Sequence, residues 1–415
     1  MGYHLIGVLV LAVVSSGIGS AQKGGGRNPL GEFSEHIREL TGHASPAVVE
    51  IVVTGYTTAD VDKGQAANQI SHQTSSASGV IVDPGGYIVT NAHVVQGAIT
   101  LRVLLPSASS SRAHDSTPNP RTRSIDARIV GIDAESDLAL IRIDQSGLPS
   151  LSFGDSDQVR QGDLVLAIGS PMGLHNSVSM GVVSAPARAV SDDNPILYIQ
   201  TDASINPGNS GGALVDTSGE LVGLNTFIVT RSGGSEGIGF AIPSNVVRNV
   251  YEQLKQKGRV SRGSVGLLVQ DISPVMAKGL GLPLEQGVVI CDVAPDKPGD
   301  IAGLQRRDIV LTLNSREVES ARQFAFDIYR RRSGEHISLE IQRGTNRLRI
   351  SVAVEEETAP WDPLSALASP EKNLIPRLGI LCIEIDKDVV NLLPDLRRSY
   401  GVIVVAKAPQ NQKVR

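Results

Sequence analysis

The sequence has few of the residues that hold small domains together or bind metal ions, since only two of its 415 residues are cysteine. Two thiols cannot build a disulfide framework or a four-cysteine zinc site. The chain is also poor in aromatic residues, at 3%, and the net charge is −5 (38 basic minus 43 acidic residues), so it lacks the basic footprint of a nucleic-acid-binding protein. We expect no metal, no cofactor and no nucleic-acid partner.

What the chain does contain is typical of a globular protein with many turns. Apolar residues make up 41% and charged residues 20%, which excludes a mainly disordered chain, and glycine occurs 43 times. At roughly 100–200 residues per domain, the length predicts two to four domains. No Walker-type phosphate-binding loop occurs, so nothing in the sequence indicates a dependence on ATP.

Residues 1–21 have the pattern of a secretory signal peptide. Residues 5–14 form a short apolar run, and Gly19-Ser20-Ala21 offers a cleavage site of small residues. The run is shorter than the about 20 apolar residues that a membrane helix needs. The region before it departs from the pattern because it lacks Lys and Arg. We expect an exported protein, and the alternative is a retained N-terminal segment that associates the protein with a membrane.

Short apolar runs separated by turn residues dominate the chain up to about residue 243, a pattern that indicates a β-barrel or β-sandwich. The clearest pair, Val80–Val82 and Tyr87–Val89, flanks the turn Asp83-Pro84-Gly85-Gly86 and predicts a hairpin. Helical spacing predicts helices over residues 33–40 and 245–257. The polar segments are expected to be flexible or looped: residues 22–32, 55–76 and 106–123.

A short pattern is repeated in the C-terminal part of the chain. Val265-Gly266-Leu267-Leu268 recurs as Leu378-Gly379-Ile380-Leu381, which predicts two copies of one module over residues 260–354 and 374–415. A linker over 355–373 would join them. The second copy has no counterpart of residues 302–350, and a sheet without those strands would have open edges and a small core.

Three segments offer an imidazole, a carboxylate and a hydroxyl in the order His93, Asp137 and Ser210. A serine hydroxyl is a poor nucleophile at neutral pH, so it needs a base such as His93 to take its proton and later to protonate the leaving amine. Asp137 would hold the imidazole in the correct tautomer and stabilise the imidazolium. Asp133 is a rival carboxylate, and Asp137 is favoured because the apolar run 138–140 follows it.

The loop around Ser210 is rich in glycine. Gly208 and Gly211 allow the backbone to bend tightly, so that the amides of Gly208 and Ser210 would converge on an oxyanion. Losing one donor of this kind typically costs about 3–4 kcal/mol of transition-state stabilisation.

These motifs together resemble the high-temperature-requirement-A (HtrA/Deg) family of serine proteases. The matching segments are TNAHVV (90–95), SDLALI (136–141), NPGNSGGAL (206–214) and GIGFAIP (237–243). The resemblance covers about residues 33–355 and the fragment after 375. It implies a mainly β protein, with a chymotrypsin-like double β-barrel protease domain over 33–257, a PDZ domain, and a truncated second PDZ-like segment.

The resemblance also implies roles for individual residues. His93, Asp137 and Ser210 would be the catalytic triad, and Gly208, Asn209 and Ser210 would form the oxyanion hole. The position that in trypsin-like enzymes sets the base of the specificity pocket is the uncharged Ser204, so we predict cleavage after small or medium aliphatic residues. The predicted pocket residues are Ser204, Ile205, Leu224, Asn225 and Thr226. Regulatory loops are expected at residues 54–76, 170–177, 187–196 and 226–236.

In digestive relatives an Asp precedes the nucleophile and pairs with a newly cut amino terminus, whereas this chain has Asn209 there. We therefore do not expect activation by that ion pair. Val265-Gly266-Leu267 resembles a PDZ carboxylate-binding loop, which holds peptide C-termini through backbone amides.

By this resemblance the protein is expected to be a periplasmic, ATP-independent serine endopeptidase that degrades misfolded or unfolded proteins in protein quality control and the stress response. Its expected partners are unfolded protein or peptide substrates and further copies of itself, as a homotrimer or a larger homo-oligomer. The alternative is a chaperone or PDZ scaffold with little or no proteolysis, and a non-proteolytic esterase is a weaker third hypothesis.

Overall fold

The structure is a computed structural model, and it describes residues 28–58, 70–105, 123–170, 177–191, 194–206, 208–230, 234–282, 287–356, 367–368, 370–375, 380–393, 396 and 398–407. The predicted signal peptide, most of the predicted linker and Gly379 of the second repeat lie outside these residues. In the part of the chain described, no helix has the length and apolar character needed to cross a bilayer.

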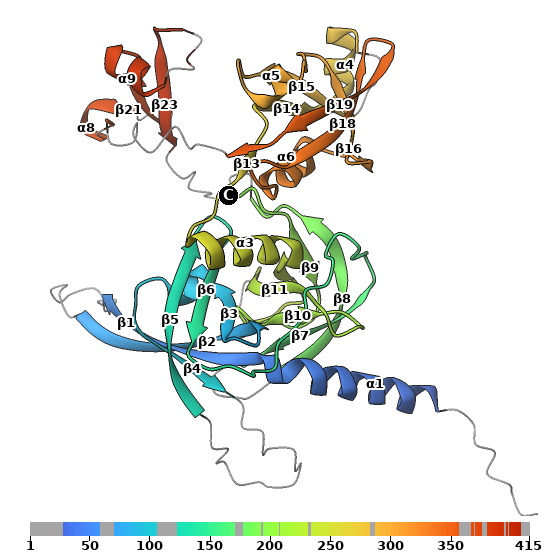
Figure 1. Cartoon of the computed structure of the whole chain (residues 1–415), viewed down its shortest axis with the longest axis vertical. Coiled ribbons are helices and arrows are strands. Elements are labelled where there is room, and N and C mark those ends of the chain that lie inside the picture. Colours follow the sequence, from blue (N-terminus) through green and yellow to red (C-terminus); the bar gives the residue numbers. More distant parts are fainter. Residues whose placement is uncertain are drawn as a thin grey trace, which may run out of the picture.

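Two closed six-stranded antiparallel barrels stand side by side in the lower half of Figure 1. The strand order is β1-β2-β3-β6-β5-β4 in the first barrel and β10-β11-β12-β9-β8-β7 in the second. The double β-barrel expected for the protease domain is therefore confirmed. The strands of the first barrel are β1 (Val48–Thr58), β2 (Ile70–Asp83), β3 (Tyr87–Asn91), β4 (Ala98–Leu105), β5 (Arg123–Asp133) and β6 (Leu138–Ile143). Those of the second are β7 (Leu164–Gly169), β8 (Ser177–Arg188), β9 (Tyr198–Thr201), β10 (Ala213–Val215), β11 (Leu221–Ile228) and β12 (Gly239–Pro243).

The predicted hairpin is present, because β2 and β3 pair with Val80 opposite Val89. The predicted loop over residues 55–76 is wrong at both ends. There β1 continues to Thr58 and β2 starts at Ile70, and β1 pairs along its whole length with residues 70–80 of β2. Polar residues such as those at 74–76 form a strand here because a long hairpin needs only backbone hydrogen bonds, not an apolar pattern.

The N-terminal helix α1 (Pro29–Ala44) is twice as long as the helix predicted over 33–40, and a 3₁₀ turn η1 (Ser45–Ala47) follows it. The predicted flexible segment 22–32 is wrong for residues 29–32, which belong to this helix, and residues 22–27 lie outside the described chain. Asn28 caps the helix by accepting a hydrogen bond from the Gly31 amide at 3.1 Å, and a proline at the first helical position has the backbone angle that a helix start needs. These two signals, rather than the apolar periodicity, set where the helix begins.

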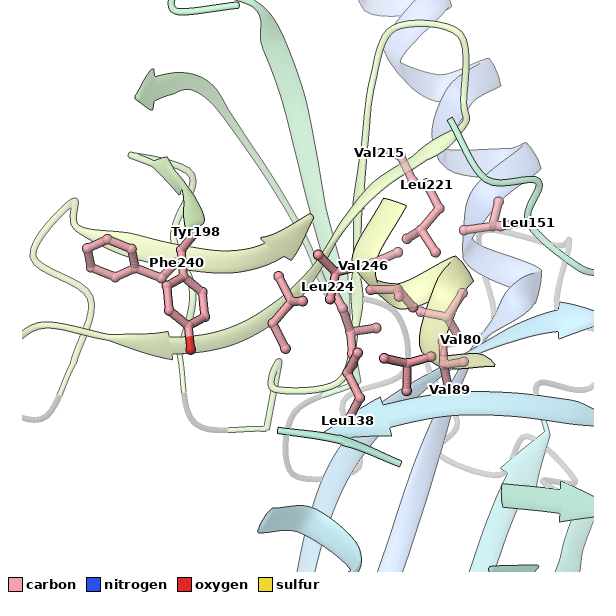
Figure 2. Close-up of a cluster of buried hydrophobic side chains, with 14 of the residues drawn as sticks. Val80, Val89, Leu138, Leu151, Tyr198, Val215, Leu221, Leu224, Phe240 and Val246 are labelled. Carbon is pink, nitrogen blue, oxygen red and sulfur yellow. The ribbon is translucent and has the colours of Figure 1, made fainter. Parts of the chain in front are cut away.

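The largest hydrophobic cluster lies where the two barrels meet (Figure 2). Val80, Val89 and Leu138 enter it from the first barrel, Leu224 enters from the second, and Val246 enters from helix α3 (Ser244–Lys257). The predicted helix over 245–257 is thus confirmed, and it ends at Gly258 in the left-handed conformation (φ 70°). Because this core is shared, side chains from both barrels are held in fixed positions along the seam between them.

The PDZ domain has a sheet of order β14-β15-β16-β18-β19, with β17 pairing with β16 and a separate pair β13-β20. Strand β14 is at the edge of its sheet, so one side of its backbone is open. Its strands are β13 (Gly263–Ser264), β14 (Leu267–Asp271), β15 (Val288–Val293), β16 (Ile309–Leu313), β17 (Arg316–Glu317), β18 (His336–Arg343), β19 (Asn346–Ala353) and β20 (Glu355–Glu356). Its helices are α4 (Pro274–Leu280), α5 (Pro298–Ile301) and α6 (Ala321–Tyr329).

The PDZ domain is docked on the α3 side of the barrels (Figure 1). Asn249 on α3 donates a hydrogen bond to the Arg330 carbonyl at 2.6 Å, and the Arg330 guanidinium pairs with Asp157 of the protease domain at 2.7 Å. Burial by itself would raise the pKa of Asp157, but the Arg330 guanidinium outweighs burial and lowers it. Arg262 also pairs with Asp133, and Arg332 pairs with Glu252 on α3, so charged contacts hold the two domains together at several places.

The C-terminal segment forms a small three-stranded sheet of order β21-β22-β23. Its core is limited to a few side chains, among them Ile383, Val389 and Ile403. In the described residues β23 pairs only with β22, so its outer edge is open, as expected for the truncated second PDZ-like segment. The elements are α8 (Pro370–Asn373), β21 (Leu374–Ile375), β22 (Ile380–Glu384), α9 (Lys387–Leu392) and β23 (Val402–Lys407).

Candidate active site

His93 and Asp137 meet at the edge of the first barrel. His93 lies on the one-turn helix α2 (Ala92–Val95), and Asp137 lies in the turn between β5 and β6. His93 Nδ1 is 2.8 Å from Asp137 Oδ2 and 3.0 Å from Oδ1. The His93 amide also donates to Asp137 Oδ1 at 3.0 Å, so one carboxylate fixes both the backbone and the ring of the histidine.

The Asp137 backbone has an unusual conformation that supports this contact. Its φ is +54°, in the left-handed region that a residue other than glycine adopts only under constraint. The Asp137 carbonyl accepts hydrogen bonds from the Ala92 amide at 3.0 Å and from Asn91 Nδ2 at 3.1 Å. The turn is thereby tied to the segment that carries His93.

The carboxyl group of Asp137 is held in its charged form. Burial alone would raise its pKa, but hydrogen bonds from the His93 ring and amide, and from the Thr226 hydroxyl, outweigh burial and lower the pKa. Thr226 Oγ1 donates to Asp137 Oδ2 at 3.0 Å, across the seam from the second barrel. An ionised acceptor at this place favours the tautomer with a proton on His93 Nδ1 and a free lone pair on Nε2.

Ser210 lies on the second barrel, in a loop that two glycines in the left-handed region bend tightly. Gly208 has φ 101° and Gly211 has φ 81°. A Cβ on Gly211 would lie 2.1 Å from the Ser78 carbonyl oxygen, so only glycine fits there. The Ser210 carbonyl accepts from the Ser78 amide at 2.9 Å, which joins the loop to the first barrel.

The Ser210 hydroxyl donates to the Thr226 carbonyl at 2.9 Å. Among the described residues, no hydrogen bond connects it with His93. The Ser210 hydroxyl must therefore leave the Thr226 carbonyl before its proton can pass to His93 Nε2. The imidazole is half-exposed, with 52% of the His93 side chain accessible to solvent.

Two amides of the serine loop are available as oxyanion donors. Within the described chain, the amides of Gly208 and Ser210 have no protein acceptor. Asn209 differs from the prediction that placed it in the hole, because its amide donates to the Asn206 carbonyl at 2.9 Å and its side chain is buried.

The structure separates the five predicted pocket residues. Leu224 belongs to the core between the barrels, and Asn225 is buried behind the serine loop, where its carbonyl accepts from the Gly211 amide at 2.8 Å. Ile205 is part of the second barrel's own core. Thr226 contacts Asp137, and Ser204 alone is exposed. Core packing therefore accounts for Ile205 and Leu224, and contacts with the serine loop and the triad account for Asn225 and Thr226, while the assignment of these residues to a specificity pocket stays a prediction.

The predicted carboxylate-binding loop lies beside a groove of about 430 Å³ between β14 and α6. Gly266 has φ 68°, and a Cβ there would lie 2.3 Å from the Lys297 side chain. Val265 and Leu267 line the groove together with Ile328 of α6 and Glu135 of the protease domain. The groove therefore reaches the turn that carries Asp137. Nowhere in the described chain do His, Cys, Asp and Glu side chains form a group that could hold a metal ion.

Comparison with known proteins agrees with this architecture. Residues 77–224 match the trypsin-like peptidase domain family and residues 263–354 match the PDZ domain family. A probable periplasmic serine endoprotease DegP-like of Marinomonas sp. is 39% identical over 326 residues, which are 78% of this chain and 66% of that protein. A protein of the same description from Ectopseudomonas mendocina is 36% identical, over 81% of this chain and 68% of that protein.

Solved structures agree as well. The HtrA-type protease AlgW with a bound decapeptide is 36% identical, with a TM-score of 0.58, over 78% of this chain and 99% of that one. The barrels and the PDZ domain thus define a trypsin-like serine peptidase joined to a peptide-binding module. The chain belongs to the HtrA family of DegP-like serine endoproteases, and it spans about two thirds of the length of its DegP-like relatives. A serine endopeptidase is therefore favoured over the chaperone or scaffold alternative.

Sequence reasoning missed the roles of Thr226 and Ser78. Thr226 was assigned to the pocket, but its hydroxyl donates to Asp137, and its carbonyl accepts from Ser210. Ser78 had no assigned role, although its amide holds the Ser210 carbonyl. The sequence signal for Ser78 is its place two residues before the apolar run Val80–Val82 of the predicted hairpin, and this does not reveal a contact with the other barrel.

Proposed function

We propose that this protein is an exported, ATP-independent serine endopeptidase of unfolded polypeptides, with Ser210 as nucleophile, His93 as general base and Asp137 as the group that orients His93. The observation that carries the proposal is that Asp137 binds both the ring and the backbone amide of His93. The loop that carries Ser210, bent by two glycines, lies on the other side of the seam between the barrels. This geometry is what acyl transfer to a serine requires.

In the proposed reaction, Ser210 Oγ attacks the scissile carbonyl carbon while His93 Nε2 takes the hydroxyl proton. The carbonyl oxygen becomes an oxyanion that the free amides of Gly208 and Ser210 stabilise. The C–N bond then breaks as His93 returns the proton to the leaving amine. A water molecule, activated by His93 in the same way, hydrolyses the acyl-enzyme and restores the Ser210 hydroxyl.

Two further observations support the location and the substrate class. The DegP-like relatives are described as periplasmic, which supports an exported location for this chain. The exposed, uncharged Ser204 supports cleavage after small aliphatic residues such as Val, Ala or Ile. Self-assembly into a trimer or a larger oligomer, through the protease domain, also belongs to the proposal.

The test is a cleavage map. The protein without residues 1–21 is incubated with reduced, carboxymethylated casein, and the products are sequenced by mass spectrometry. We expect cuts after Val, Ala or Ile, none of which depends on ATP, and no cuts in a folded lysozyme under the same conditions. Cuts mainly after Lys or Arg would contradict the pocket assignment. Suppressed aggregation without any cleavage would contradict the endopeptidase.

We further propose that the groove between β14 and α6 binds peptide C-termini, with the peptide adding as a strand to the open edge of β14. Gly266→Val is expected to weaken binding of a decapeptide that ends in a free aliphatic carboxylate by more than tenfold. The new side chain would collide with Lys297 in a backbone conformation that disfavours β-branched residues. Fluorescence anisotropy of the labelled peptide measures the effect.

The matched control is Gly344→Val in the β18–β19 turn. This glycine also has a positive φ, 59°, but its Cβ would meet no atom within 4 Å. The Gly344→Val protein should bind the decapeptide as tightly as the unmodified protein does. The same decapeptide with an amidated C-terminus should bind weakly to both of these proteins. Equal affinity of Gly266→Val and Gly344→Val for the free carboxylate would contradict the assignment of the loop.

A further inference from the structure

A single residue of the first barrel contacts the serine loop at two points. Ser78, on β2, has no solvent exposure. Its hydroxyl donates to the Gly208 carbonyl at 2.6 Å and accepts from the Ser170 amide at 2.8 Å. Its backbone amide donates to the Ser210 carbonyl at 2.9 Å. Ser78 therefore binds the carbonyls of the two residues whose amides are the proposed oxyanion donors.

These two contacts restrict how the donors can turn. The Gly208 amide and carbonyl belong to different peptide planes that meet at one Cα. Holding the carbonyl fixes one of these planes, so the direction of the amide depends only on the φ and ψ of Gly208. Glycine has no Cβ to limit φ, and Gly208 lies at φ 101°. Gly208 therefore has few conformational limits of its own, although catalysis needs its N–H group to keep one direction toward the oxyanion. In the described chain, the only hydrogen bond that the Gly208 carbonyl accepts is the one from Ser78.

The surroundings keep the Ser78 hydroxyl in one orientation. The Ser170 amide can only donate, so it occupies a lone pair of the hydroxyl oxygen and leaves the proton for the Gly208 carbonyl. The Ser78 carbonyl in turn accepts from the Thr90 hydroxyl at 2.7 Å, three residues before His93. The serine loop and the strand that leads to His93 are therefore joined through Ser78.

We propose that Ser78 is a positioning residue that holds the oxyanion hole in its catalytic geometry through its side-chain hydroxyl. The proposal rests on the proposed function and adds to it a residue of the opposite barrel. Ser78 contacts no reacting atom, and its buried hydroxyl acts through the Gly208 carbonyl. The backbone contact from the Ser78 amide would survive a side-chain change, so the hydroxyl can be tested separately.

The experiment compares Ser78→Ala with Ser244→Ala. Ser244 is a matched control because it is equally buried and its hydroxyl also donates to a backbone carbonyl, that of Gly154, at 2.8 Å. That bond lies at the start of α3 and touches neither the serine loop nor His93. For each variant, kcat and KM on a peptide ending in a chromogenic amide after Val are measured. Inhibition by the corresponding peptide aldehyde is measured as well, because its hemiacetal oxygen occupies the oxyanion position.

For Ser78→Ala we expect kcat to fall about 10- to 100-fold, somewhat less than the loss of a whole donor, since the amides are misplaced and not removed. KM should change less than twofold, and the inhibition constant of the aldehyde should rise in parallel with the fall in kcat. The midpoint of the pH profile should not move, because the His93–Asp137 pair is untouched. Ser244→Ala should keep its kcat within twofold, whatever its loss in melting temperature.

Several results would overturn the proposal. One is a folded Ser78→Ala protein with unchanged kcat, and another is an equal loss of kcat in Ser244→Ala. If Ser78→Ala does not fold, Ser78→Cys decides, because a thiol of similar size is a weaker donor and should give an intermediate kcat. A Ser78→Cys protein as active as the unmodified one would then contradict the proposal. Failure of the unmodified protein to cleave any peptide would instead contradict the proposed function.

Discussion

Replacing Ser210 by alanine is expected to lower kcat about 10⁶-fold, because the change removes the only nucleophile that the site offers to a peptide carbonyl. The residual rate would come from substrate binding and the oxyanion donors alone. KM should change little, because the Ser210 hydroxyl is hydrogen-bonded to the Thr226 carbonyl and is not expected to contribute to binding of the substrate before the reaction. The measurement is the initial rate on the chromogenic peptide amide, supported by labelling with a fluorophosphonate, which should modify only proteins that retain Ser210.

Stability should not explain the loss. The Ser210 hydroxyl makes one hydrogen bond, to the Thr226 carbonyl, and the residue is half-buried, so the melting temperature should move by only a few degrees. Ser218→Ala is the matched control, because Ser218 lies in an exposed turn of the same barrel. Among the described residues its backbone amide donates a hydrogen bond to Asp216, and its hydroxyl makes none. A Ser210→Ala protein that keeps a hundredth or more of the activity would show that another group is the nucleophile.

The sequence predicted the parts of this site that are encoded locally. His93 and Ser210 each lie in a short motif in which the neighbouring residues form the required turn, and the glycines at 208 and 211 have the positive φ that the loop needs. The choice of Asp137 over Asp133 also followed from the apolar run after it. In the structure Asp133 pairs instead with Arg262, at the contact with the PDZ domain.

Contacts between distant elements could not be predicted in this way. The sequence predicts Thr226 as a residue of the specificity pocket and gives no sign of its contact with the triad. Thr226 lies on β11 of the second barrel, and its side chain meets Asp137, 89 positions earlier, across the seam. Which hydroxyl faces which carboxylate depends on how two barrels pack, and a pattern of apolar residues does not contain that information.

The error over residues 55–76 has a related cause. The polar composition there predicts a loop. In the structure β1 and β2 continue into this segment because their backbones pair with each other, which composition does not reveal. The sequence also does not indicate that the PDZ domain contacts the barrels. This contact depends on single side chains such as Arg330, which reaches Asp157 from a stretch of three arginines that would otherwise be assigned to a solvated helix face.

Replacing Asp137 by asparagine is expected to lower kcat about 10⁴-fold while leaving the fold intact. The geometry explains why. Asp137 Oδ1 accepts from the His93 amide, which can only donate, so the asparagine oxygen must take that place. The NH₂ group then takes the place of Oδ2, 2.8 Å from His93 Nδ1, and the Thr226 hydroxyl can rotate to accept from it. Nδ1 becomes an acceptor, the ring proton moves to Nε2, and Nε2 can no longer take the proton of Ser210.

The pKa of Asp137 makes this variant informative over a wide pH range. Because the pKa is lowered from 3.8, the carboxylate of the unmodified protein stays ionised at every pH above that value, and the contribution of its charge is lost only as the pH falls through the lowered pKa. The loss of rate in Asp137→Asn at neutral pH therefore reports the tautomer and charge of the pair, and not a shifted titration of Asp137 itself.

Two measurements separate this explanation from a general loss of structure. The downfield NMR signal of the Nδ1 proton shared by His93 and Asp137 should be present in the unmodified protein and absent from Asp137→Asn. Asp126→Asn is the control, because Asp126 is an exposed carboxylate on β5 of the same barrel, paired only with Arg102. It should keep both the signal and the rate. If Asp137→Asn retains a tenth or more of the normal kcat, then Asp137 does not set the tautomer of His93, and the double contact between these two residues serves the fold of the turn alone.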